Sequence, residues 1–103
     1  MNIICDKSKL LEGINISLKA IPGKSTMAIL ECMVIEAKDG IIKLISNDLE
    51  IGIETIIEGE IKEPGSVAVN AKVFFEIIRK LPYNEVTISV NENLTMNITC
   101  GKA

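Results

Sequence analysis

The sequence predicts an α+β fold in which two helices pack on antiparallel β-sheets. Two segments, 7–21 and 70–82, place apolar residues at helical spacing along one side. The stretches between and after them alternate polar and apolar residues, the pattern of strands with one buried face. Turn signals such as residues 38–40 (Lys-Asp-Gly) separate those stretches, as in antiparallel hairpins. With 103 residues, the chain is expected to form a single domain over 1–103.

The first part of the chain predicts a strand, a helix and three more strands. Residues 1–5 predict a short strand, and Asp6 can cap the helix that follows because its carboxylate can accept from a free backbone N–H. Pro22 ends that helix. Three strands are then predicted at 27–37, 41–46 and 49–61. The alternation of the last one breaks at residues 56–57, which predicts a bulge or a change of exposed face.

The second part predicts a short strand, the second helix and a final hairpin. Residues 66–69 lead directly into the helix, which Asn70 caps and Pro82 ends. Two period-two segments follow, 86–90 and 94–100. The predicted order is therefore β-α-β-β-β-(β)-α-β-β, where the parentheses mark the short extended piece at 66–69.

The helix over 70–82 has three distinguishable faces at 100° per residue. The face expected to point to the core consists of Phe74, Phe75, Ile78 and Leu81. The opposite face is basic, with one acid, Glu76, among Lys72, Arg79 and Lys80. Between the two lies an apolar flank of Val73 and Ile77, with Leu81 at its edge. Two interpretations of this flank stay open: it completes the domain's own core, or it contacts a second apolar partner.

Charge is segregated along the chain, although the net charge is only −3. Segments 7–24 and 71–80 hold seven basic and two acidic residues, a net charge of +5. The remainder holds four basic and twelve acidic residues, a net charge of −8. Such a distribution can attract a polyanion to one face of the molecule. The alternative is that these segments form ordinary solvated faces.

The residue types of most catalytic and metal sites are missing. The chain has no His, and its cysteines, Cys5, Cys32 and Cys100, are widely spaced, so we expect buried structural thiols and neither a metal site nor a disulfide framework. Asp48 and Glu50 share a strand face, but no basic or nucleophilic residue accompanies them. A Gly-rich phosphate loop is also missing. We therefore expect a protein that is not an enzyme and needs no cofactor.

Nothing in the sequence predicts a membrane partner. An apolar run of 18 residues is missing, and the first residues lack the basic start and long apolar region of a signal peptide. We therefore expect a cytoplasmic protein.

Four segments, in their order and spacing, resemble the N-terminal domain of the bacterial sliding clamp, the beta subunit of DNA polymerase III. They are LKAIP at 18–22, TMAIL at 26–30, NDLE at 47–50 and AKVFFEIIRKLP at 71–82. The resemblance extends over essentially all 103 residues. One departure is Ala28, where the family usually has Pro. The family's protomer has three such domains, so this chain is expected to be the first of them and to end inside its last strand.

The resemblance implies a DNA-clamp domain and a function as a processivity factor. Two protomers would form a ring, head to tail, whose hole is lined by helices. Duplex DNA would thread the hole through contacts that carry no sequence information, and the ring would tether the replicative polymerase. The implied partners are duplex DNA, the second protomer and, through domains absent from this chain, the catalytic subunit of DNA polymerase III and the clamp loader. The implied location is the cytoplasm, in association with the nucleoid.

The resemblance also implies roles for individual residues. In the family, the basic residue in the loop after the first helix contacts DNA, and Lys24 occupies that place. Lys72 and Arg79 match basic positions of the family on the second helix that lines the hole. Lys80 is basic without a clear family counterpart and is added as a DNA-binding candidate. The ring-closing contact with the other protomer would use Val73, Ile77 and Leu81. A different class of function stays open: a small α+β module that binds a protein through this flank and does not bind DNA.

Overall fold

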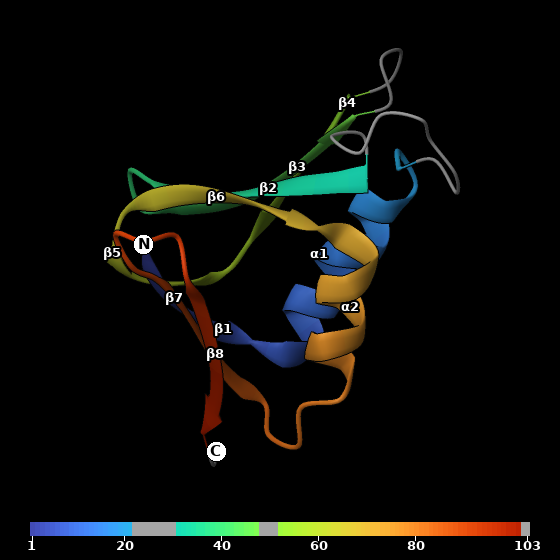
Figure 1. Cartoon of the computed structure of the whole chain (residues 1–103). Helices are drawn as coiled ribbons and strands as arrows, with labels where there is room; N and C mark the ends of the chain where they lie inside the picture. The colour runs from blue at the N-terminus through green and yellow to red at the C-terminus, as the bar shows by residue number, and fades with distance from the viewer. Residues whose placement is uncertain (22–30, 48–51, 102–103) are drawn as a thin grey trace.

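The computed structural model describes residues 1–21, 31–47 and 52–101 of the chain. Within these residues it forms two helices and eight strands (Figure 1). Their order is β1 (Asn2–Asp6), α1 (Lys7–Leu18), β2 (Cys32–Lys38), β3 (Ile41–Asn47), β4 (Gly52–Ile57), β5 (Gly59–Glu63), β6 (Gly65–Asn70), α2 (Ala71–Arg79), β7 (Glu85–Val90) and β8 (Met96–Gly101).

The strands form two antiparallel sheets of four strands each. One sheet has the order β5-β1-β7-β8 and the other has the order β4-β3-β2-β6. The helices α1 and α2 contact each other and lie together on one side of the two sheets (Figure 1). The predicted fold class, two helices packed on antiparallel sheets, is confirmed.

The two halves of the chain exchange strands. Each half begins with a strand that runs directly into a helix, β1 into α1 and β6 into α2, and each continues with a hairpin, β2-β3 and β7-β8. The first strand of each half pairs with the hairpin of the other, so that Asn2 lies opposite Ser89 and Cys32 opposite Asn70. The halves are therefore interlocked, and neither sheet can form from one half alone.

The core lies between the sheets and the helices and receives residues from both halves. Its fully buried side chains include Ile3, Leu10, Ile14, Met33, Ile35, Ile42, Leu44, Ile78, Val86 and Ile88. On the strands, the buried residues alternate with half-buried or exposed ones, as the period-two pattern of the sequence predicted.

The segment predicted as one strand over 49–61 is two strands in different sheets. The structure describes this segment from residue 52: β4 ends at Ile57 in one sheet, and β5 begins at Gly59 in the other. A Cβ atom at Gly59 would lie 2.7 Å from the Ile4 carbonyl oxygen and 2.7 Å from Ile42 Cδ1. The break predicted at residues 56–57 is thus a crossing between sheets, and it requires glycine because the backbone passes so close to β1.

Two other predicted elements are shorter than expected. The helix predicted over 7–21 ends at Leu18, and the backbone N–H groups of residues 19–21 donate to carbonyls three residues back at 3.1–3.2 Å. This tighter turn fits the approach to Pro22, because a residue before proline is disfavoured in the α-helical conformation. The strand predicted over 94–100 begins at Met96, because Leu94 has a φ of 60° within the turn before it. Residues 27–30 of the predicted strand 27–37 lie outside the described residues, and β2 begins at Cys32.

Candidate nucleic-acid and partner interface

The strand β6 runs directly into α2, and Asn70 forms the junction. The Asn70 Oδ1 atom accepts a hydrogen bond from the Val73 backbone N–H at 3.0 Å, which satisfies one of the free donors at the helix N-terminus. The cap predicted from the sequence is confirmed.

The other end of α2 is held by the first residue of α1. The Lys7 Nζ atom donates a hydrogen bond to the Leu81 carbonyl oxygen at 2.6 Å, and the Lys7 backbone N–H donates to the Asn84 carbonyl oxygen at 2.7 Å. A cation at a helix C-terminus is favourable, because the last carbonyls carry partial negative charge. Part of the positive charge of the α1 segment is therefore placed at the end of α2.

The apolar residues of α2 divide into buried and exposed sets. Ala71, Phe74 and Ile78 are buried, whereas Phe75 and Leu81 are half-buried at the edge of the core. Val73 is 57% exposed and Ile77 is 43% exposed. The interpretation that Val73 and Ile77 complete the domain's own core is therefore wrong, because other parts of the described chain leave them open to solvent.

Basic residues border this apolar flank. Lys72 and Arg79 are exposed on α2, and Lys80 is exposed directly after its last residue. Lys72 and Lys80 line one shallow hollow of ≈ 340 Å³ together with Glu76 and the flank residues Val73 and Ile77. The structure thus brings the predicted DNA-binding and partner-binding residues of α2 onto adjoining parts of one surface. Lys24 lies outside the described residues, as do Asp48 and Glu50.

Arg79 on α2 and Lys9 on α1 form ion pairs with acids. Arg79 Nη2 lies 2.5 Å from Glu76 Oε2, one helical turn away. The hydrogen bond from Arg79 lowers the pKa of Glu76 and raises that of Arg79. On α1, the ammonium of Lys9 pairs with the carboxylate of Glu58, which lies between β4 and β5. The charge segregation counted along the sequence is therefore partly neutralised where the chain folds.

The Lys9–Glu58 and Lys7–Leu81 contacts are not predictable from the sequence. The partners are 49 and 74 residues apart, and no local pattern of the sequence signals either contact.

The expectation that all three cysteines are buried is wrong for two of them. Cys5 is buried, whereas Cys32 and Cys100 are half-buried. In β2, the half-buried Cys32 precedes the buried Met33. In the edge strand β8, the half-buried Cys100 follows the exposed Thr99.

Among the described residues, no three His, Cys, Asp or Glu side chains are grouped so that they could hold a metal ion.

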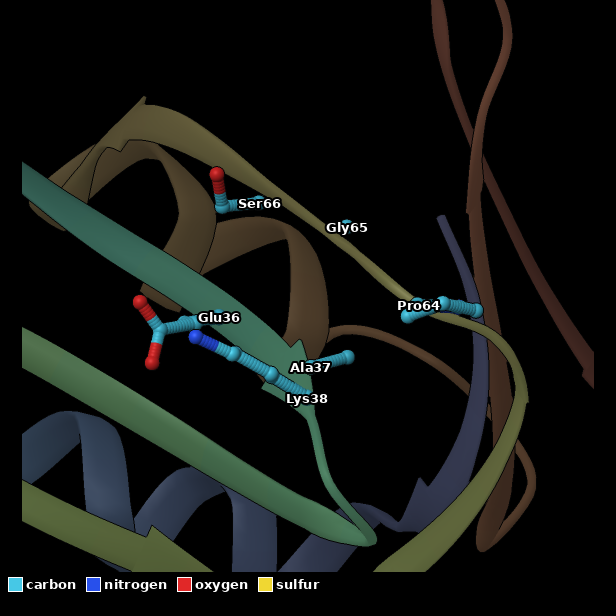
Figure 2. Close-up of a pocket in the computed structure, with 6 residues that line it drawn as sticks. All are labelled: Glu36, Ala37, Lys38, Pro64, Gly65 and Ser66. Carbon is cyan, nitrogen blue, oxygen red and sulfur yellow. The ribbon is translucent and has the colours of Figure 1, made fainter.

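Another hollow, of ≈ 340 Å³, lies at the far end of β6 from α2. Figure 2 shows its lining, with Glu36, Ala37 and Lys38 on β2, Pro64 before β6, and Gly65 and Ser66 at the start of β6. The side chains of Glu36 and Lys38 point away from Pro64 and toward each other in this view, and the Ser66 hydroxyl points elsewhere. The polar groups of the lining therefore do not converge on the space between β2 and Pro64 as they would in a ligand site. None of the helices in the described part of the chain is long and apolar enough to span a membrane.

Solved structures identify the fold as that of a DNA clamp. The chain superposes with a TM-score of 0.93 and 53% sequence identity on a Eubacterium rectale protein assigned as a DNA polymerase III beta subunit, covering 100% of this chain and 28% of that one. It superposes with a TM-score of 0.91 and 32% identity on the DNA polymerase sliding clamp of Bacillus subtilis, covering 100% of this chain and 29% of that one. The arrangement of two interlocked halves is therefore an α+β clamp domain.

The sequence comparison identifies the family. The sequence model of the DNA polymerase III beta subunit, N-terminal domain, matches residues 1–103. The protein of Staphylococcus epidermidis named "Beta sliding clamp" is 37% identical over 109 residues, which cover 98% of this chain and 29% of that protein. The chain belongs to the family of the DNA polymerase III beta subunit, N-terminal domain, as the resemblance predicted. It spans about 29% of the length of the curated relatives that it matches.

Proposed function

We propose that this chain is the first domain of a sliding clamp that encircles duplex DNA and increases the processivity of a replicative polymerase. The observation that carries the proposal is that one surface of α2 exposes basic and apolar side chains side by side, in a chain whose whole length matches the family. The basic residues Lys24, Lys72, Arg79 and Lys80 contact phosphates of the DNA. Such contacts carry no sequence information, as a protein that moves along DNA requires.

The apolar flank of α2 closes the ring in this proposal. Val73 and Ile77, with the half-buried Leu81 beside them, contact the C-terminal domain of a second protomer. Their exposure in the single chain supports this role, because an interface core needs apolar side chains that are left uncovered by the domain itself.

The domain acts by binding and not by catalysis. The catalytic subunit of DNA polymerase III and the clamp loader bind other domains of the full-length protein. The clamp works in the cytoplasm, in association with the nucleoid.

Substitution of the basic residues tests the DNA contact. In the full-length protein, we expect Lys24→Ala, Lys72→Ala, Arg79→Ala and Lys80→Ala each to weaken binding to a short duplex to the same extent for every sequence. Each substitution should also lower the slope of log K against log salt by up to about 1, because one phosphate contact and its counterion are lost. Lys38→Ala, at the exposed end of β2, is the matched control and should leave the slope unchanged.

Trapping on circular DNA tests the ring. Protein loaded on a closed circle should stay bound at high salt and should dissociate when the circle is cut, since only topology holds it there. If the variant that carries all four alanine substitutions keeps the salt slope of the parent, Lys24, Lys72, Arg79 and Lys80 do not contact DNA. If high salt removes the protein from the closed circle, the protein does not form a ring around the DNA.

A second candidate function rests on the same flank. Because Val73 and Ile77 are exposed, the domain also fits a module that binds a protein partner without DNA. That function predicts no trapping on circular DNA and no salt-dependent binding to a duplex.

A further inference from the structure

Glu76 is the one acid of α2, and it lies at the centre of the helix's basic residues. It follows Lys72 by four positions and precedes Arg79 and Lys80 by three and four. Residues three or four apart are neighbours on a helix surface, so all three cations lie within one turn of this carboxylate. Among these neighbours, the structure pairs Glu76 with Arg79 at 2.5 Å.

The pair is accessible to a ligand. The side chains of Arg79 and Glu76 are 53% and 50% exposed, so solvent and a passing phosphate can both reach the guanidinium. The pKa of Glu76 is lowered, first by the hydrogen bond from Arg79 and also by the positive charges of Arg79 and Lys80. Glu76 is therefore ionised at neutral pH.

A carboxylate and a phosphate compete for the same donors. The guanidinium group offers a planar set of N–H donors that fits either anion. When Arg79 donates a hydrogen bond to Glu76, fewer of its N–H groups are available for DNA. A phosphate that binds Arg79 must therefore displace the Glu76 carboxylate or share the guanidinium group with it.

We propose that Glu76 is an internal competitor for DNA phosphate that holds Arg79 in the unbound domain and thereby weakens its contact with the duplex. This inference rests on the proposed function and adds a regulating residue to the same surface. A clamp held by topology does not need tight phosphate contacts, and each tight contact would slow its movement along DNA. Glu76 keeps the Arg79 contact weak enough to be broken and remade.

A double-mutant cycle in the full-length protein tests the proposal. The variants are Glu76→Gln, Arg79→Gln and the double variant, and the measurement is the dissociation constant for a short linear duplex as a function of salt. We expect Glu76→Gln to tighten binding by about two- to fivefold, the factor that corresponds to a typical exposed ion pair. The same substitution should have a much smaller effect in the Arg79→Gln background, because the Arg79–Glu76 ion pair is then already lost.

Two controls separate this mechanism from simple loss of negative charge. Glu54→Gln, on the exposed side of β4, makes the same change in net charge away from α2 and should leave binding unchanged. On long DNA, Glu76→Gln should also slow one-dimensional diffusion of the loaded clamp, and Glu54→Gln should not.

The outcomes distinguish this inference from the proposed function. If Glu76→Gln tightens binding equally in the Arg79→Gln background, the effect is long-range repulsion and the inference is overturned. If Glu76→Gln leaves binding unchanged while Arg79→Gln weakens it, the inference fails and the proposed function stands. If the parent protein shows no salt-dependent binding to the duplex, both fail.

Discussion

At the scale of single residues, burial decides how the cysteines behave. Cys5 lies on β1 with its side chain in the core, and burial, aided by the neighbouring charge of Asp6, raises its pKa from the ordinary 9.0 to about 11. A thiol reacts as the thiolate, so a buried thiol with a raised pKa is inert at neutral pH. The half-buried Cys100 on the edge strand β8 is closer to solvent.

We expect thiol reagents to modify Cys100 well before Cys5 in the native chain at pH 8. Peptide mapping by mass spectrometry after short exposure measures this order, and unfolding in denaturant should make the rates similar. Equal native rates at Cys5 and Cys100 would contradict the burial argument.

The same shift predicts a pH dependence. The unfolded chain releases the Cys5 proton near pH 9.0 and the folded chain only near 11. The titration of Cys5 therefore lowers the free energy of unfolding as the pH rises through this window. Below the window the thiol is protonated in both states, so Cys5 adds no pH dependence there. The Cys5→Ala variant should lose this part of the dependence.

The Asn70 cap gives a prediction for a second single residue. Asn70→Ala removes the acceptor for the Val73 N–H and should lower the free energy of unfolding by about 1 kcal/mol. Urea denaturation measures the loss. Asn70→Asp keeps an acceptor at the same position and should retain most of the stability, so an equal loss in both variants would show that the cap is not the cause.

Caps were predictable from the sequence because their donors and acceptors lie within three residues of each other. Asn70 was found in this way, and so was Asp6, whose carboxylate accepts from the backbone N–H groups of Ser8 and Lys9 at 2.9 and 3.3 Å. The Lys7–Leu81 bond was not predictable, because it depends on how the two helices pack.

At the scale of elements, Gly13 sets how closely α1 approaches the sheet. A Cβ atom at this position would lie 3.1 Å from Leu44 Cδ1 and 3.3 Å from Ile57 Cγ2. Both contacts are tighter than ordinary packing, so a side chain here pushes α1 away from β3 and β4. The cost of glycine within a helix is offset by this close packing.

We expect Gly13→Val to lower the free energy of unfolding by about 1–3 kcal/mol through overpacking. Gly52→Val makes the same change on β4, where an added Cβ meets nothing within 4 Å, and should stay within about 0.5 kcal/mol of the parent. Chemical denaturation of the two variants compares them directly. Equal losses in the two variants would contradict the packing argument at Gly13.

Sequence patterns predicted the type of each element better than its extent. Periodicity identified both helices and the strands, because alternation and helical spacing record which face is buried. The division of segment 49–61 between two sheets was not predictable, because the break in alternation at residues 56–57 indicates a change of exposed face and not a change of partner strand. The crossing becomes evident only when Gly59 is placed against Ile4 and Ile42.

At the scale of the whole molecule, the exposed flank of α2 predicts assembly. In the full-length protein, Ile77→Lys places a charge in an apolar contact and should give monomers at concentrations where the parent is dimeric. Sedimentation measures the difference.

Leu94→Lys serves as the control for the interface. Leu94 is 75% exposed in the turn before β8, so the same chemical change should leave the dimer intact there. Dimers that persist in Ile77→Lys, or dissociation in both variants, would remove the flank from the interface.

The surface of α2 was predictable from the helical wheel, because basic and apolar residues repeat at fixed spacing. The helical wheel does not show which apolar residues of α2 are buried by other elements of the same domain. It placed Phe75 and Leu81 with the core, and both are half-buried, because coverage depends on neighbouring elements that the wheel does not contain.

The exchange of strands between the two halves has a consequence for synthesis on the ribosome. The strand β1 is made first, but its neighbours in the sheet, β5 and β7, begin at residues 59 and 85. At about 5–20 residues per second, β1 waits roughly 4–17 s for the strand β7 that completes its pairing. Ile3 and Cys5 have no partner strand until β5 is made, and β1 lacks its second neighbour until β7 is made. We therefore expect the domain to complete its fold late, once its last hairpin has emerged.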